Sequence, residues 1–199
     1  TVEEYFSLMD VITDDVDLIA YIKRDIAKMP IRDLEILRKH KLIVGNSRDA
    51  NSHYKSSNKF LNRLLKRTDL AEISYKPGKA PGSFAHEFAH FVAAKTHLYQ
   101  DDKFLDVIAN SVRGADLDCT EINGTKYVRV LSDKFVEPYQ GRTYLTYEDF
   151  EKKGTIDLSD LTEYVSVGYK TYIVDPQGLY TRDKTLYDYF ESEGLYHDK

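Results

Sequence analysis

The spacing of apolar side chains along the chain predicts several amphipathic helices. Between residues 14 and 28, apolar residues recur every three or four positions, as they do on the buried face of a helix. The acidic pair Asp14 and Asp15 favours a helix N-terminus, and Pro30 favours an end shortly after residue 28. The same spacing predicts the remaining helices, over residues 2–10, 31–39, 57–67, 84–98, 102–111, 159–174 and 182–192.

Shorter apolar runs predict strands between these helices. Residues 41–44 form a buried strand that ends at Gly45, and residues 71–75 alternate as a strand does. The pair Asn123 and Gly124 separates two strand-like arms within residues 118–130, which predicts a β-hairpin. We expect loops over residues 47–57 and, with short strands, over residues 132–158.

This order of elements predicts an α+β fold, with helices around a small mixed sheet. We expect a helical N-terminal lobe over residues 1–69 and a catalytic lobe over residues 70–199, joined in one compact unit. A hydrophobic content of 42% in 199 residues is enough for a packed core.

Charge and cysteine content limit the kinds of partner and binding site that the protein can have. The net charge is −5 and the basic residues are dispersed, which argues against nucleic acid and anionic membranes as partners. Cys119 is the single cysteine, so an intrachain disulfide and a cysteine zinc site are excluded. No stretch approaches 18 apolar residues, the length of a membrane span. Because the chain starts at Thr1 without methionine, we expect a fragment or a processed form.

The segment His86-Glu87-Phe88-Ala89-His90 carries the strongest chemical signal. Two histidines four residues apart project from the same face of a helix, so both imidazoles can bind one Zn²⁺. Glu87 lies beside this pair, where it can act as general base toward a water that the ion activates. No glycine or proline interrupts the chain from Phe84 to Leu98, which places the motif inside a helix.

A catalytic zinc needs a third protein ligand. His97 is seven residues beyond His90, about 10 Å along a helix axis, which is too far for the same ion. The extended metzincin pattern is also excluded, because position 93 is alanine and position 96 is threonine. The third ligand must therefore come from another segment.

Glu163 is the best candidate for that ligand. Ser159 is a suitable N-cap, which puts Glu163 near the start of a largely apolar helix. The small residues Ser166 and Gly168 would let a neighbouring helix approach closely. Asp157 remains a rival, as an aspartate ligand from a loop.

These residues resemble the gluzincin arrangement of the anthrax lethal factor and Pro-Pro endopeptidase clan. The resemblance covers roughly residues 70–190 and implies a zincin-like fold with the HExxH helix at the active site and Glu163 as third zinc ligand. The run Pro138–Tyr144 followed by Glu163 also resembles metallopeptidase-like domains of phage Mu-type minor head proteins and prophage toxins. Where the clan carries a tyrosine seven residues before the third ligand, this chain has Ile156.

Another residue must therefore stabilise the oxyanion of the transition state. Tyr139, Tyr144 and Tyr147 precede Glu163 in the predicted loop, and we favour Tyr144, with Arg142 as an alternative donor. Any one tyrosine is a weak signal, because the chain has 16 of them.

The sequence thus predicts a zinc-dependent metalloendopeptidase that acts on protein or peptide substrates. The alternatives are a phage-associated structural or interaction domain on a zincin scaffold, and a secreted toxin or effector protease. We expect a secreted or phage-associated protein rather than a resident cytoplasmic enzyme.

Overall fold

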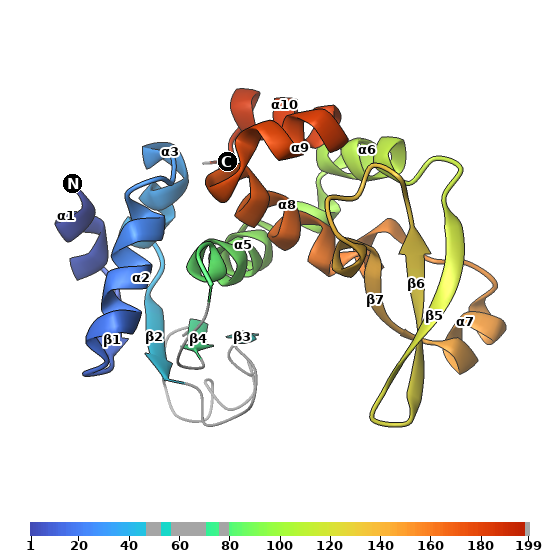
Figure 1. Ribbon diagram of the computed structural model, residues 1–199, viewed down its shortest axis with the longest axis horizontal. Helices are drawn as coiled ribbons and strands as arrows, with labels where there is room; N and C mark the ends of the chain where they lie inside the picture. Colours follow the sequence, from blue (N-terminus) through green and yellow to red (C-terminus); the bar gives the residue numbers. More distant parts are fainter. Residues whose placement is uncertain (47–52, 57–70, 76–79, 198–199) are drawn as a thin grey trace. The chain divides into compact units, whose positions relative to one another are not determined.

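A computed structural model describes residues 1–46, 53–56, 71–75 and 80–197 of the chain, and Figure 1 shows its helices and strands. The chain divides into two compact units. Unit 1 is Thr1–Thr96 together with Gly194–Lys199, and unit 2 is His97–Glu193. Helices and two small sheets make a mixed α+β protein, as predicted. The predicted lobe boundary between residues 69 and 70 falls outside the described residues.

Unit 1 combines helices with a four-stranded mixed sheet. Its elements are α1 (Val2–Ser7), β1 (Asp10–Ile12), α2 (Val16–Ile26), α3 (Ile31–Leu34), η1 (Glu35–Arg38), β2 (Leu42–Asn46), β3 (His53–Ser56), β4 (Ala71–Tyr75) and α5 (Ser83–Thr96).

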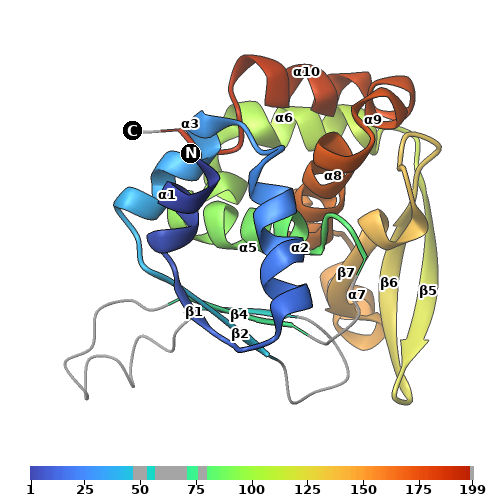
Figure 2. The ribbon, with the colours of Figure 1, turned by 60° about the vertical axis from the view of Figure 1, so that its left-hand side comes forward.

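The sheet of unit 1 has the strand order β1-β2-β4-β3. β2 runs parallel to both β1 and β4, and β3 is antiparallel to β4. Val44 and its neighbour Ile73 are fully buried at the centre of the sheet. Helix α5 packs against α2, β3 and β4, and Figure 2 shows α2 and α5 on one side of the strands.

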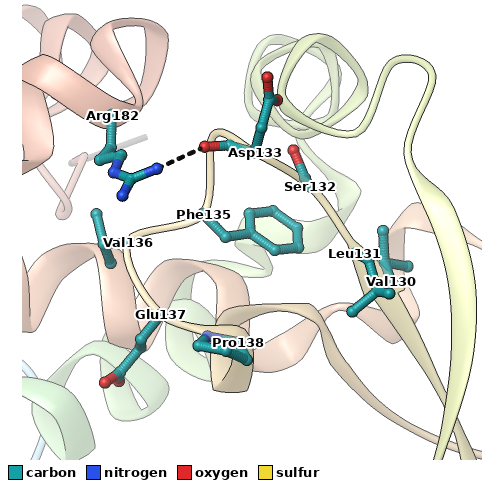
Figure 3. Close-up of a pocket in the computed structure, with 9 residues that line it drawn as sticks. All are labelled: Val130, Leu131, Ser132, Asp133, Phe135, Val136, Glu137, Pro138 and Arg182. Atoms are coloured by element: carbon teal, nitrogen blue, oxygen red, sulfur yellow. Dashed lines mark hydrogen bonds between the residues drawn. The ribbon is translucent and has the colours of Figure 1, made fainter.

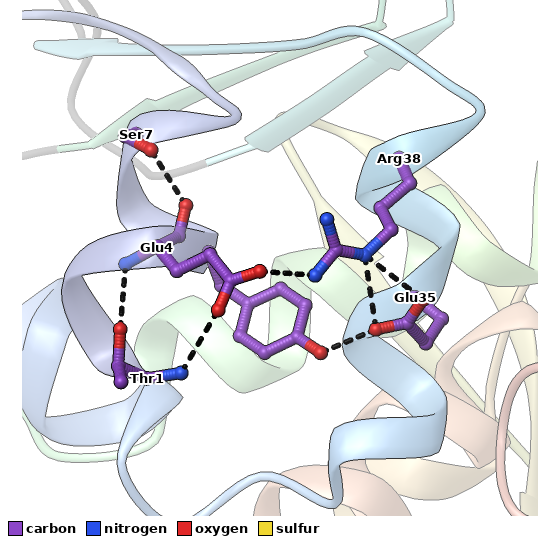
Figure 4. A network of polar contacts seen from close by, with 6 residues as sticks. Thr1, Glu4, Ser7, Glu35 and Arg38 are labelled. Carbon is purple, nitrogen blue, oxygen red and sulfur yellow. Dashed lines mark hydrogen bonds and ion pairs between the residues drawn. The ribbon is translucent and has the colours of Figure 1, made fainter.

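A polar network fastens the N-terminal helix α1 to η1 (Figure 4). Thr1 and Glu4 form a capping box at the start of α1. Glu4 also forms an ion pair with Arg38, which in turn pairs with Glu35 at 3.0 Å. The Tyr5 hydroxyl donates a hydrogen bond to Glu35 from beneath this pair. The exposed ion pairs of this network contribute little to the free energy of unfolding, so the network mainly fixes the position of α1.

The N-terminus of α5 is capped by an acidic side chain from α2. Asp25 is 3% exposed, and its carboxylate accepts hydrogen bonds from the backbone N–H groups of Gly82 and Phe84 at 3.0 Å and of Ala85 at 3.3 Å. Burial raises the pKa of Asp25, although these three N–H groups oppose the rise. A negative charge is also favoured at a helix N-terminus. Asp25 therefore fixes where α5 begins.

A second buried aspartate ties the C-terminal segment into unit 1. Oδ1 of Asp33 accepts hydrogen bonds from the backbone N–H groups of Leu195 at 2.7 Å and Tyr196 at 3.0 Å. Gly194 precedes them with φ of +80°, and a Cβ there would lie 2.8 Å from Oδ1 of Asp33. The turn at this position therefore needs glycine.

Unit 2 surrounds one central helix with helices and a three-stranded sheet. Its elements are η2 (Leu98–Gln100), α6 (Asp102–Ser111), β5 (Asp116–Ile122), β6 (Thr125–Leu131), η3 (Pro138–Gly141), β7 (Arg142–Thr146), α7 (Tyr147–Lys153), η4 (Leu158–Asp160), α8 (Thr162–Val174), α9 (Pro176–Arg182) and α10 (Lys184–Ser192).

Helix α8 is the core of unit 2. Its residues 163–169 are all buried, and it contacts η3, β7, α9 and α10. A Cβ on Gly168 would lie 2.4 Å from Cδ2 of Leu186, so this glycine permits the close approach of α10. Nearby, the hydroxyls of Ser111 and Tyr164 and Oδ2 of Asp183 lie within 2.7 Å of one another in a buried network.

The predicted hairpin is confirmed. β5 and β6 are antiparallel, and Asn123 and Gly124 form the turn with φ of +51° and +78°. The predicted strands at residues 41–44 and 71–75 correspond to β2 and β4, and the predicted helix at 102–111 is α6. Among the described residues, no helix is long and apolar enough to span a membrane.

Several predicted boundaries are wrong. The first helix stops at Ser7, and residues 10–12 instead pair with β2. Residues 53–56 form strand β3 within a predicted loop. Helix α5 ends at Thr96, because His97 adopts a left-handed conformation with φ of +54°. The predicted helix at 57–67 lies outside the described residues.

Two helices in unit 2 were not predicted. Thr146 caps α7 by accepting a hydrogen bond from the Asp149 N–H, and Gly154 ends it with φ of +75°. Asp175 caps α9 in the same way, with Pro176 at its first position. Helix α7 lies within a predicted loop, and α9 lies between two predicted helices, where the sequence indicated no element.

We predict that Asp25→Ala destabilises unit 1 by about 2–3 kcal/mol, because three buried N–H groups lose their acceptor. Urea denaturation followed by circular dichroism measures the loss. Hydrogen exchange should also become faster at the Phe84 and Ala85 amides. Asp17→Ala, at an exposed position of the same helix, is the control and should cost less than about 1 kcal/mol. Equal losses in the two variants would contradict the capping role.

Candidate metal centre

The two histidines are the partly exposed members of an otherwise buried stretch of α5. Between Phe84 and Ala93, all residues except His86 and His90 are buried, and these two histidines are partly exposed to solvent. Their ring centroids are 5.0 Å apart, with the ring planes 80° from each other. Helical spacing thus presents two imidazoles side by side on one face of unit 1, as the sequence predicts.

Glu87 is the one carboxylate within that stretch of α5. It is 6% exposed and lies next to the first histidine of the pair. A buried carboxylate is costly unless polar groups or a cation offset its desolvation. Its place beside the first histidine of the pair makes Glu87 a candidate for a chemical role.

In unit 2, Glu163 lies in the first turn of α8 and is 3% exposed. Oε1 of its carboxylate accepts a hydrogen bond from the Tyr144 hydroxyl at 2.7 Å. Oε2 accepts one from the Ser166 hydroxyl at 3.1 Å. Both oxygens are thus oriented by neighbouring hydroxyl groups, an arrangement typical of carboxylates that bind metals.

Tyr144 is the residue that donates a hydrogen bond to Oε1 of Glu163. Tyr144 is 54% exposed overall. Burial of the hydroxyl and the negative charge of Glu163 raise the pKa of Tyr144 well above its usual value. The phenol therefore stays protonated at neutral pH and remains a hydrogen-bond donor.

The first turn of α8 is held by the half-buried Tyr99, which the sequence did not indicate. The Tyr99 hydroxyl lies 2.8 Å from the carbonyl oxygen of Leu161 and 3.0 Å from that of Thr162, and it accepts a bond from the Val165 N–H at 3.4 Å. This hydroxyl replaces the predicted N-cap Ser159, which lies in η4 instead. No local pattern reveals this contact, because Tyr99 is more than sixty residues away in the sequence.

The rival ligand Asp157 has a structural role in unit 2. It caps η4 and forms an ion pair with Lys153, and its side chain is 58% exposed. Tyr147 lies on α7, where its ring packs against Phe150. Of the small residues on α8, Ser166 bonds Glu163 and Gly168 admits α10, so the predicted close approach is to a helix of the same unit.

A separate hollow of about 330 Å³ opens beside the segment that links β6 to η3 (Figure 3). Its wall is largely apolar and includes Phe135 and Val136. Arg182 lies at its edge and donates a hydrogen bond to the carbonyl oxygen of Asp133 at 3.3 Å. The described residues that line this hollow include none of the predicted site residues.

No protein-family model matches the chain, and no curated protein matches it.

We predict that Glu163→Gln lowers the pKa of Tyr144 in the metal-free protein, because a nearby negative charge that disfavours the phenolate is removed. The tyrosine Cζ signal in carbon-13 NMR, assigned by its loss in Tyr144→Phe, reports this titration. Asp157→Asn, which neutralises an exposed carboxylate on η4, is the control and should leave the signal unchanged. An unaltered Tyr144 titration in Glu163→Gln would contradict the hydrogen bond between them.

Proposed function

We propose that the chain is a zinc-dependent metalloendopeptidase of the gluzincin type, in which His86, His90 and Glu163 bind the ion. The observation that carries the proposal is the exposure pattern of α5, where the histidines alone interrupt a buried stretch. Two partly exposed imidazoles whose ring centroids are 5.0 Å apart on one helix face are suitably spaced to bind one ion. The zincin-like fold is part of the same proposal, supported by the packing of α5 on a mixed sheet.

The donor set suits zinc. His86, His90 and Glu163 together offer two imidazole nitrogens and one carboxylate oxygen, a group that could hold a metal ion. Two histidines and one glutamate are the ligands of known catalytic zinc sites, which keep a further position open. The hydroxyls of Tyr144 and Ser166 would hold the Glu163 carboxylate in place for this role.

Zinc, when bound, would polarise the attacking water and the scissile carbonyl group. Glu87 would take the proton from that water and deliver it to the leaving amine nitrogen. The low exposure of Glu87 supports this role, because a base shielded from bulk solvent exchanges its proton less readily with bulk water. As ligands, the two imidazoles would add no negative charge to the site, so only the Glu163 carboxylate among the three ligands would offset the charge of the ion.

Tyr144 would act first as the residue that positions Glu163. Its hydroxyl has a single proton, which is donated to Glu163 at 2.7 Å. To stabilise the oxyanion as well, it would have to exchange this bond for one to the substrate. The raised pKa of Tyr144 keeps that proton available in either arrangement.

We predict that the purified or zinc-reconstituted protein holds about one zinc ion per chain. His86→Ala and His90→Ala should each lose it, and Glu163→Ala should weaken binding by more than the roughly 10- to 100-fold typical of residues that only support a ligand. Elemental analysis and competition with a chelator measure these changes.

Asp157→Ala is the matched control for Glu163→Ala, because it removes an exposed carboxylate from η4 and should leave zinc affinity unchanged. Circular dichroism checks that each variant is folded. Failure of the wild-type protein to take up any divalent metal would refute the proposed function. Zinc loss in Asp157→Ala with retention in Glu163→Ala would move the third ligand to Asp157.

We predict that Glu87→Gln retains zinc and loses peptidase activity by about 100-fold or more, because the side chain keeps its shape but can no longer accept a proton. Cleavage of a synthetic peptide library, followed by mass spectrometry, measures activity, and elemental analysis measures zinc in the same sample. A variant that loses zinc together with activity would show that Glu87 supports the metal and does not transfer protons.

A further inference from the structure

Arg142 occupies an unusual position at the start of β7. Tyr139 precedes it in η3, and Tyr144 follows it two residues later, on the same face of the strand. The guanidinium carbon lies 5.2 Å from the ring centroid of Tyr139 and 4.9 Å from that of Tyr144. Two aromatic rings therefore hold the cation in a fixed place.

The charge of Arg142 has no anionic partner among the described residues. Its Nη1 donates a long hydrogen bond of 3.3 Å to the Tyr139 hydroxyl, and its Nε is buried without an acceptor. The cross-strand neighbour of Arg142 is another arginine, Arg129, which forms an ion pair with Asp118 at 2.7 Å. Like charges opposite each other in a sheet are unfavourable, so the unpaired arginine would be stabilised by an anion.

The chemistry of a clamped guanidinium favours one kind of anion. Its planar fork of N–H donors matches a carboxylate, which can accept two parallel hydrogen bonds. Tyr144 joins Arg142 to the candidate ligand Glu163, because its ring contacts the guanidinium and its hydroxyl bonds the carboxylate. A group held by Arg142 would thus lie close to the residues at which the peptide bond is cleaved.

We propose that Arg142 binds a carboxylate of the peptide substrate and thereby determines which bond is cleaved. This inference rests on the peptidase function proposed above and names its substrate class, peptides that present a carboxylate at a fixed distance from the scissile bond. The carboxylate is either an aspartate or glutamate side chain or the free C-terminus. Arg142 is then a specificity residue, in place of the carbonyl-polarising role considered from the sequence.

The test uses a synthetic peptide library prepared in four matched forms. The peptides carry a free or an amidated C-terminus, and either contain or lack aspartate and glutamate. Wild-type enzyme should cleave at least one carboxylate-bearing form about 10- to 100-fold better than the form with neither, mainly through KM. Comparison of the other forms identifies the source of the carboxylate.

Arg142→Gln should abolish this preference while retaining zinc, and Arg142→Lys should keep part of it, because it preserves the charge but not the planar fork. Arg182→Gln, which removes an exposed arginine bonded to a backbone carbonyl, is the control and should behave as wild type. Binding is measured separately with the Glu87→Gln variant and the best-cleaved peptide. Adding Arg142→Gln should weaken its Kd by a similar factor.

Equal cleavage of all four forms by a zinc-loaded, active wild type would overturn the role of Arg142 and leave the peptidase proposal standing. A loss of kcat in Arg142→Gln that is the same for every form, with unchanged peptide binding, would also overturn it and indicate a carbonyl-polarising role. A wild type that binds no zinc and cleaves no peptide would refute both proposals, and the zinc measurement identifies that case.

Discussion

The structure depends on one constraint, which is that a polar group removed from water must find a partner. Both units bury carboxylates, and each one whose contacts are described accepts hydrogen bonds from backbone N–H groups or side-chain hydroxyl groups. Asp25 fixes the start of α5 and Asp33 holds the C-terminal segment. In unit 2, Asp183 caps α10 and joins the Ser111–Tyr164 pair, while Glu163 is held by two hydroxyl groups. These contacts define positions that apolar packing alone would leave less specific.

The same constraint explains how much of the fold could be predicted. Elements with a local signal, such as the hairpin at Asn123 and Gly124 and the apolar pattern of α6, were predicted with the correct bounds or nearly so. The start of α8 was misplaced, because Ser159 is a good local cap but the Tyr99 hydroxyl stabilises the first turn from a distant segment. Helix α7 was missed although Thr146 and Gly154 mark its ends, since its seven residues have no buried face to create a periodic pattern.

The candidate centre shows the same division between local and distant information. The histidine pair and Glu87 follow from a five-residue motif, because helical geometry alone determines which side chains share a face. The partners of Glu163 do not follow from spacing. The sequence suggested Tyr144 as a donor to the oxyanion, whereas its hydroxyl donates a hydrogen bond to Glu163. Ser166 was noted for its small size, whereas its hydroxyl donates a hydrogen bond to the same carboxylate. Pairings across loops depend on tertiary packing, which a single sequence does not specify.

The proposed metal centre rests on the chemistry of the residues themselves. An HExxH sequence can occur in any helix, and a fold by itself does not determine function. Here, however, α5 keeps Glu87 buried among aromatic and small apolar residues, and α8 does the same with Glu163. Burial of each carboxylate carries a desolvation penalty, which polar partners such as the two hydroxyl groups around Glu163 offset. The proposed metal centre would give a chemical role to the Glu87 and Glu163 carboxylates and to the partly exposed histidine pair. The hydroxyl groups that orient Glu163 fit such a role.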